Sequence, residues 1–102
     1  MSFYEKCYTL LKKVPRGKVT TYKALAVALN TKAYMVVGSA MKKNPMAPLV
    51  PCHRVINSDG HIGGYMGSKK DNTEKKIEML TKEGVKVING KIDLDKYMYE
   101  FR

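Results

Sequence analysis

The first third of the chain carries apolar residues at helical intervals. A stripe spaced i, i+4, i+7, i+8 and i+11 predicts an amphipathic helix, and it is formed by Phe3, Cys7, Leu10, Leu11 and Val14. Pro15 would end this helix. On this pattern Cys7 is a small core residue.

Two shorter apolar patterns follow and predict a pair of helices. Thr21 can cap the first of them, whose inner face would hold Tyr22, Leu25, Ala26 and Leu29. After a polar break at residues 30–31, a second helix over residues 32–43 would bury Val36, Val37, Ala40 and Met41. Two short helices joined by a tight turn favour a helix-turn-helix, although any αα-hairpin has the same pattern.

The second half of the chain is punctuated by proline and glycine. Asn44 precedes a proline and therefore disfavours a continuing helix. Residues 45–56 are apolar and proline-containing, and residues 57–67 form a glycine-rich loop. Asp71 or Asn72 could cap a further helix that runs through Ile77, Leu80 and Glu83, with Gly84 as its stop.

The last pattern is a turn signal between alternating residues. Asn89-Gly90 lies in the middle of VKVINGKIDL (85–94), which predicts a type I′ β-hairpin. A short closing helix would follow and contain Leu94, Tyr97, Met98 and Phe101. The expected fold is therefore one domain over residues 1–102, mainly α with a small C-terminal β-hairpin.

Composition adds a strong positive charge to this picture. The chain has 19 Lys and Arg residues and nine Asp and Glu residues, so the formal net charge is +10 over 102 residues. This excess favours a polyanionic partner such as nucleic acid, although a lysine-rich solubility shell has the same composition. No apolar run approaches the roughly 20 residues of a membrane span. Glu5 and Lys6 also interrupt any apolar segment of the signal-peptide kind. We expect a soluble, intracellular protein.

The candidate chemistry lies in the segment LVPCHRVI, where Cys52 and His53 stand side by side. A thiol with a pKa near 8.5 is only about 3% ionised at pH 7, and lowering that pKa to about 7 raises the thiolate fraction roughly fifteenfold. His53 could act as the activating base if a carboxylate held its other ring nitrogen. Glu83 is chemically suited to that task.

Two other readings of the pair remain open from the residues alone. Cys52 could be a core thiol beside a surface histidine. A metal site would need further ligands, and the spacings of Cys7, Cys52, His53 and His61 match no paired zinc pattern. Two cysteines also make no disulfide framework, so both are expected as thiols in a reducing compartment.

An ordered set of motifs resembles the O6-alkylguanine-DNA alkyltransferases. The motifs are PRGKVTTYKALA (15–26), GSAMKKNP (38–45), PCHRVI (51–56), GGYMG (63–67) and LTKEG (80–84). The resemblance extends over most of the chain and corresponds to the family's catalytic and DNA-binding domain, which is helical and built around a helix-turn-helix in a winged-helix-like arrangement. The N-terminal domain of many members is expected to be absent.

The resemblance implies a reaction and its residues. Cys52 would irreversibly accept a methyl or other alkyl group from O6 of guanine, with O4 of thymine as an alternative target, once per protein. His53 would activate Cys52 through a water, and Glu83 would orient His53. Asn44 would brace the turn beneath the cysteine. The Tyr22 hydroxyl would help to protonate the departing guanine. The resemblance implies no cofactor and no metal.

Further residues are implied in the base pocket. Tyr65 would lie in the loop that closes over the pocket, where backbone N–H groups, including that of Gly64, face O6. Met66 stands where the family often has a small or hydroxylated residue and could narrow the range of alkyl groups. The backbone carbonyls of Cys52 and Val55 would accept from the exocyclic amine of the guanine. Arg54 matches the motif's arginine, for which we expect a structural role.

The implied partner is double-stranded DNA that contains O6-alkylguanine, bound by a monomer with little sequence specificity and no membrane involvement. The second helix of the motif would enter the minor groove, and the target base would be flipped out. The DNA could approach this helix closely at its small residues, which are Ala33, Gly38 and Ser39. Its phosphates would be bound by basic side chains, which are Lys32, Lys42, Lys43, Arg16 and Lys18. Met35 occupies the position of the family's base-replacing arginine, so Met35 or Tyr34 would fill the gap.

Two other function classes share this pattern. Alkyltransferase-like sensors have the same fold and bind alkylated guanine, but they lack the acceptor cysteine that this chain has at Cys52. A plain helix-turn-helix DNA-binding protein with an incidental cysteine is the third class. The leading expectation is an intracellular repair methyltransferase, cytoplasmic in a prokaryote or nuclear in a eukaryote.

Overall fold

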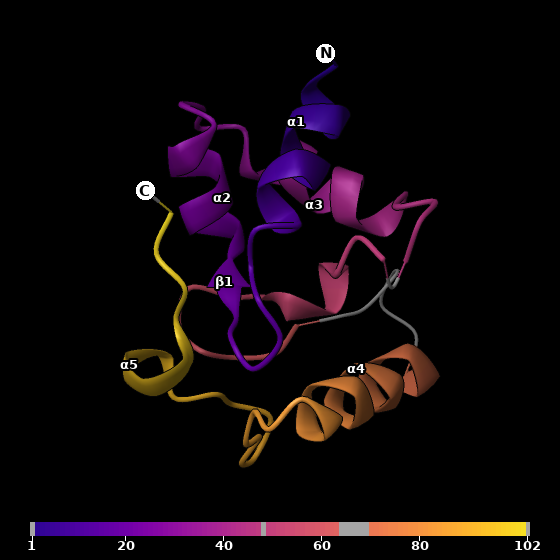
Figure 1. Ribbon diagram of the computed structural model, residues 1–102, viewed down its shortest axis with the longest axis vertical. Coiled ribbons are helices and arrows are strands. Elements are labelled where there is room, and N and C mark those ends of the chain that lie inside the picture. The colour runs from indigo at the N-terminus through magenta and orange to yellow at the C-terminus, as the bar shows by residue number, and fades with distance from the viewer. Residues whose placement is uncertain (1, 48, 64–69, 102) are drawn as a thin grey trace.

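The helices lie in two groups on either side of a short pair of strands (Figure 1). The computed structural model describes residues 2–47, 49–63 and 70–101. The first group comprises α1 (Phe3–Leu11), α2 (Tyr22–Ala28) and α3 (Tyr34–Lys42). The second comprises α4 (Lys70–Lys82) and α5 (Leu94–Tyr97). Between them lie β1 (Thr20–Thr21), the 3₁₀ turn η1 (Cys52–Arg54) and β2 (Val55–Ile56).

Helix α1 begins with a capping box, in which the Ser2 hydroxyl accepts from Glu5 N and the Glu5 carboxylate accepts from Ser2 N. Cys7 is fully buried, which confirms that it packs in the core. The helix ends at Leu11, before the predicted stop at Pro15. The chain tightens there into i→i+3 hydrogen bonds, which keep Val14 buried although it is no longer helical.

Helices α2 and α3 form the predicted helix pair. Thr21 caps α2, because its hydroxyl accepts from Ala24 N at 3.0 Å. Helix α3 begins at Tyr34 instead of residue 32, since Ala33 has non-helical backbone angles (φ −82°, ψ 66°). Val36 was expected in the core, but it is 40% exposed. Val37, Ala40 and Met41 share the buried face of α3, and Val36 lies beside that face.

The sheet differs from the expected one. Asn89 and Gly90 both have positive φ (51° and 73°), and Ile88 and Lys91 exchange two backbone hydrogen bonds, so the predicted tight turn is present. No extended hairpin flanks it in the described chain, because Lys91 also bridges to His61 and Ile92 N bonds to Gly60 O, so the pairing within the turn ends at Ile88 and Lys91. The regular strands are β1 and β2, which run parallel with Thr20 opposite Val55 and Thr21 opposite Ile56.

The C-terminal segments close the second group of helices. The predicted cap at Asp71 or Asn72 is wrong, since α4 begins at Lys70 and both residues lie in its first turn. Gly84 (φ 88°) does end the helix as predicted, with Val85 N bonded to Leu80 O in a Schellman arrangement. The closing helix is α5 alone, which ends at Tyr97 because residues 98–101 continue in extended form.

The core has two parts that meet at the strands. One joins α1, α2 and α3 to Val50, Cys52 and Val55. The other joins Ile56 to α4 and to the segment that ends in α5. Cys52 thus packs against the first group of helices, close to the point where the two parts of the core meet. Across the described ranges, no helix has the length and apolarity that crossing a membrane requires.

Candidate active site

Cys52 opens the 3₁₀ turn η1 and is only 4% exposed. The backbone reaches it through Pro51, whose angles (φ −81°, ψ 68°) are those of an inverse γ-turn closed by Cys52 N and Val50 O at 2.8 Å. Proline suits this position because its ring fixes φ near −65°. The thiol is therefore held at a tightly specified point of the backbone.

Asn44 braces the segment that leads to this turn. Its Nδ2 donates to Val50 O at 2.7 Å, and its Oδ1 accepts from Met46 N at 3.0 Å. The side chain is 3% exposed. Val50 O thus accepts hydrogen bonds from both Asn44 Nδ2 and Cys52 N.

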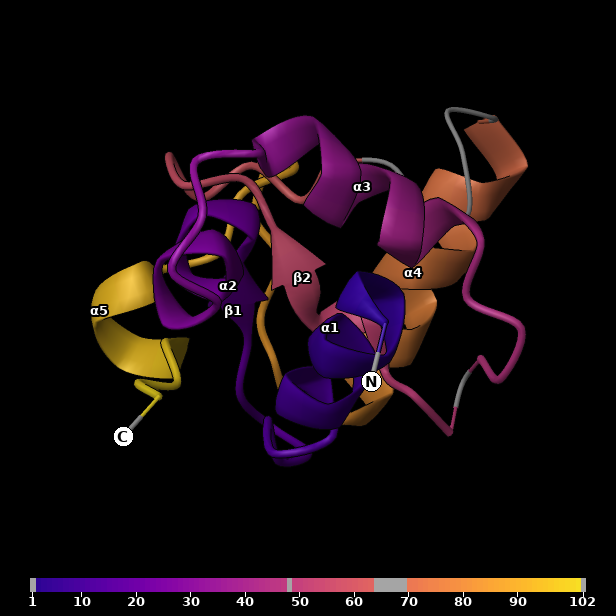
Figure 2. The ribbon, with the colours of Figure 1, turned by 90° about the horizontal axis from the view of Figure 1, so that it is seen from above.

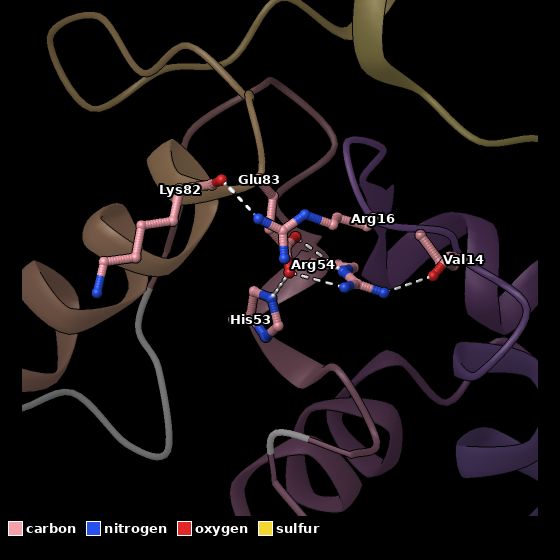
Figure 3. A network of polar contacts seen from close by, with 6 residues as sticks. All are labelled: Val14, Arg16, His53, Arg54, Lys82 and Glu83. Atoms are coloured by element: carbon pink, nitrogen blue, oxygen red, sulfur yellow. Dashed lines mark hydrogen bonds and ion pairs between the residues drawn. The ribbon is translucent and has the colours of Figure 1, made fainter.

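His53 and Arg54, the other two residues of η1, converge on Glu83 just beyond α4 (Figure 3). His53 Nε2 lies 2.9 Å from Glu83 Oε2. Arg54 binds the same carboxylate with two donors, Nε to Oε1 at 2.9 Å and a terminal nitrogen to Oε2 at 2.7 Å. Its other terminal nitrogen donates to Val14 O at 2.8 Å. The structure therefore brings Glu83 into contact with both His53 and Arg54.

The electrostatics of this trio keep the imidazole neutral. Burial lowers the pKa of His53, the contacts with Glu83 oppose that effect, and the charges of Arg54 and Lys76 reinforce it. Burial raises the pKa of Glu83, but the hydrogen bonds from Arg54 and His53 outweigh it and the net pKa is lowered. A neutral His53 donates through Nε2–H to Glu83 and keeps a lone pair on Nδ1. That Nδ1 is buried and has no hydrogen-bond partner among the described residues.

Tyr22 belongs both to the edge of the core and to the lining of a surface hollow. It packs against the core cluster that contains Cys52. Burial raises the pKa of its hydroxyl, and the negative charge of an ionised Cys52 raises it further. Its other side lines a hollow of about 520 Å³ together with Lys23, Tyr34, Asn57, Ser58 and Asp59. Tyr22 is thus electrostatically coupled to Cys52 and also lines the hollow.

Sequence reasoning missed Lys76, which is fully buried on α4. Its ammonium donates to Val55 O at 2.7 Å and to Ile62 O. A signal existed, since Lys76 precedes Leu80 by four residues and so falls on the apolar stripe of the helix. Val55, expected to accept from a guanine amine, thus already accepts from Lys76 through its carbonyl.

Three other expected pocket residues cannot be placed. Gly64, Tyr65 and Met66 lie outside the described residues. Within the described ranges no three His, Cys, Asp or Glu side chains come together as metal ligands.

The expected DNA-contacting residues of α3 share one exposed surface. Met35 is 88% exposed and Tyr34 46% exposed at the start of the helix. A Cβ built on Gly38 would meet nothing within 4 Å, so the helix is low and open there. Further residues on or next to α3 are Ala33 and Ser39, of which Ser39 is partly buried, and the exposed Lys32, Lys42 and Lys43.

Arg16 and Lys18 do not join that surface. The loop that carries them and α3 lie at opposite sides of the molecule (Figure 2). Arg16 donates to Lys82 O at 2.8 Å, where it caps the end of α4, and Lys18 donates to Lys96 O at 3.3 Å. Their basic side chains are engaged in holding the second group of helices, so a single DNA surface that includes them and α3 is not what the structure shows.

Comparison with known proteins decides the family. Residues 2–85 match the family model described as "6-O-methylguanine DNA methyltransferase, DNA binding domain". The chain belongs to this family. Cys52, His53, Asn44 and Glu83 all fall within the matched range.

Individual relatives give the same assignment. A "Bifunctional methyltransferase/endonuclease" of Picrophilus torridus is 39% identical over 100 residues, which are 97% of this chain and 32% of that protein. The O6-methylguanine-DNA methyltransferase of Pyrococcus kodakaraensis superposes with a TM-score of 0.71 at 49% identity, over 83% of this chain and 47% of that one. The chain spans less than half of the length of the curated relatives it matches.

A second kind of relative matches more of the fold. Schizosaccharomyces pombe Atl1, solved in complex with damaged DNA containing O6-carboxymethylguanine, superposes with a TM-score of 0.85 at 32% identity. The match covers 97% of this chain and 95% of Atl1. The segment after residue 85, which the family model does not include, is therefore part of the fold that these two chains share.

Proposed function

We propose that this chain repairs DNA by moving an alkyl group from O6 of a flipped-out guanine to the sulfur of Cys52, once per protein. The observation that carries the proposal is the buried trio at the nucleophile. Glu83 holds Nε2 of His53 at 2.9 Å, which leaves Nδ1 as the basic nitrogen beside Cys52 in the family's PCHRV sequence. This is the arrangement that activates a cysteine.

In the proposed reaction the thiol proton passes through a water to His53 Nδ1. The Cys52 thiolate then attacks the alkyl carbon, so that a sulfur–carbon bond forms as the carbon–O6 bond breaks. The electron pair of the broken bond stays on the guanine, which takes a proton from the Tyr22 hydroxyl. A raised pKa keeps that hydroxyl protonated until the guanine anion develops. Solvent returns a proton to Tyr22.

We propose the exposed face of α3 as the DNA-contacting surface, entering the minor groove. Tyr34 and Met35 project from the start of this helix and would fill the space left by the extruded base. Tyr34 also lines the hollow beside Tyr22, so the same residue would touch both the duplex and the path of the flipped base. Lys32, Lys42 and Lys43 would hold phosphates without reading sequence.

A second candidate function is lesion binding without transfer. The nearly full-length match to Atl1 favours it over a generic DNA-binding role. The presence of Cys52 argues for transfer, because the sensors of this family lack the acceptor cysteine.

Single-turnover transfer from a duplex with one radiolabelled O6-methylguanine separates the two candidates. We expect Cys52→Ala to abolish transfer and to keep its affinity for the lesion, because the thiol supplies chemistry and the pocket supplies shape. Cys7→Ala is the matched control, since Cys7 is the other fully buried thiol, carried by α1 and not by η1, and the variant should retain transfer. Label found on the Cys52→Ala protein would refute the assignment of the nucleophile.

A further inference from the structure

One charged side chain in the second group of helices is completely buried. Lys76 has no exposed surface, although transferring an ammonium from water into a protein interior is costly. It projects from α4, the helix that packs against η1. Its ammonium binds the carbonyls of Val55, directly after η1, and of Ile62, in the second core cluster. One side chain thus ties the residue that follows η1 to the segment that contains Ile62.

The charge of this group is coupled to the thiol. Burial lowers the pKa of Lys76 from 10.5 to about 8, and the negative charge of an ionised Cys52 acts in the opposite direction. With a pKa near 8, about 90% of Lys76 is still protonated at pH 7. Among the described residues, the charge of Lys76 also lowers the pKa of His53, which shares Glu83 with Arg54 in an ion pair of 2.7 Å. At neutral pH a buried cation therefore lies against the Val55 carbonyl, three residues after Cys52.

We propose that Lys76 is a positioning residue of the nucleophile, which holds the Cys52 turn through the Val55 carbonyl and stabilises the Cys52 thiolate by its charge. The inference rests on the proposed function and adds a second source of activation to it. His53 removes the proton from the thiol, and Lys76 stabilises the anion that remains. The same charge disfavours a protonated imidazole, which keeps His53 ready to accept.

The hydrogen bond to Val55 O gives Lys76 a further effect on binding. A carbonyl has two lone pairs, so Val55 O can accept from Lys76 and from a guanine amine together. The ammonium orients this carbonyl in advance. Loss of Lys76 should therefore destabilise the thiolate and also leave the Val55 carbonyl less well oriented for the guanine amine.

The direct test compares Lys76→Met with Lys76→Arg. Methionine keeps a flexible chain of similar length without charge, whereas arginine keeps the charge and donors. Lys75→Met is the matched control, because Lys75 is the exposed neighbour on the same helix. The thiol pKa is measured by iodoacetamide modification across pH 5–10, with the Cys52 peptide quantified by mass spectrometry so that Cys7 does not contribute.

We expect Lys76→Met to raise the thiol pKa by about one unit, which lowers the thiolate fraction and the transfer rate at pH 7 about five- to tenfold. Lys76→Arg should restore most of both, and Lys75→Met should match the wild type. A folded Lys76→Met protein with the wild-type pH profile would overturn the inference. So would a Lys76→Arg protein that loses as much as Lys76→Met.

A reciprocal measurement leaves Lys76 intact, in case its substitution prevents folding. The pKa of its ammonium is read by ¹⁵N NMR in the wild type and in Cys52→Ser, which cannot form the anion near neutral pH. If the two charges stabilise each other, the pKa of Lys76 falls in Cys52→Ser. An unchanged pKa means that Lys76 does not stabilise the thiolate.

Neither the thiol titration nor the NMR measurement involves DNA. Coupled pKa values without any alkyl transfer would leave this inference standing and remove the proposed function. Alkyl transfer without any coupling between the pKa values of Cys52 and Lys76 would support the proposed function and overturn this inference.

Discussion

The ion pair between Arg54 and Glu83 makes the most demanding prediction about stability. Both side chains are largely buried, with 16% and 9% of their surface exposed, so water screens their charges poorly. Arg54→Met leaves the Glu83 carboxylate with His53 alone, and Glu83→Gln leaves the Arg54 guanidinium without its anion. Each change therefore leaves a buried charge without its partner in the ion pair.

The magnitude follows from the contacts that are lost. Removing one partner of a buried pair costs about 3 kcal/mol at the lower end of the usual range. Arg54→Met also removes the donor to Val14 O, which adds about 1 kcal/mol. The double variant leaves neither charge unpaired. Its loss in the free energy of unfolding should therefore be smaller than the sum of the two single losses by about 2 kcal/mol.

Urea denaturation of the four proteins at pH 7.5 measures this coupling. The exposed pair of Glu78 and Lys82, 2.9 Å apart on α4, is the matched control, and Glu78→Gln should leave the midpoint unchanged. Additive costs in the cycle would show that Arg54 and Glu83 do not act as a unit. Arg54 would then not be the residue that fixes the Glu83 carboxylate for His53.

Three further predictions concern the reaction, the DNA surface and pH. Tyr22→Phe should slow single-turnover transfer about a hundredfold by removing the proton donor, and an unchanged rate would remove Tyr22 from that role. Met35→Arg should tighten binding to lesion-containing duplex about fivefold, equivalent to about 1 kcal/mol, in a fluorescence anisotropy titration; a flat affinity would mean that this position does not fill the gap of the flipped base. Acid should destabilise the fold in two steps. The folded-state pKa of His53 is lowered, so the unfolded chain binds its proton first and the free energy of unfolding declines as the pH falls below 6.5. The lowered pKa of Glu83 adds a second decline below about 4.5, and urea midpoints that do not move between pH 7 and 4 would contradict both assignments.

Local chemistry accounts for what could be predicted from the sequence. The Thr21 cap, the Asn89-Gly90 turn and the Gly84 stop each depend on a few adjacent residues whose backbone preferences are strong. The proximity of Glu83 to His53 is a different case, because 30 residues separate them. It came from the resemblance of the motifs to a family and not from any pattern within the chain.

The errors share a physical cause, which is that tertiary contacts decided the outcome. Strands β1 and β2 have two residues each and pair across 35 positions, so no local periodicity marks them. The expected hairpin is shortened because Lys91 pairs with His61. Arg16 appeared to be a phosphate contact by its charge alone, whereas its geometry assigns it to the end of α4. Net charge indicates the kind of partner but not which basic residues face it.

Alkyl transfer to Cys52 can be observed by intact mass spectrometry after incubation with a duplex that carries one O6-methylguanine, with peptide mapping to find the modified residue. We expect a gain of one methyl group per protein, located on Cys52, that saturates at one equivalent of duplex. Binding of the lesion without any change in mass would contradict the proposed transfer and assign the chain to lesion recognition alone.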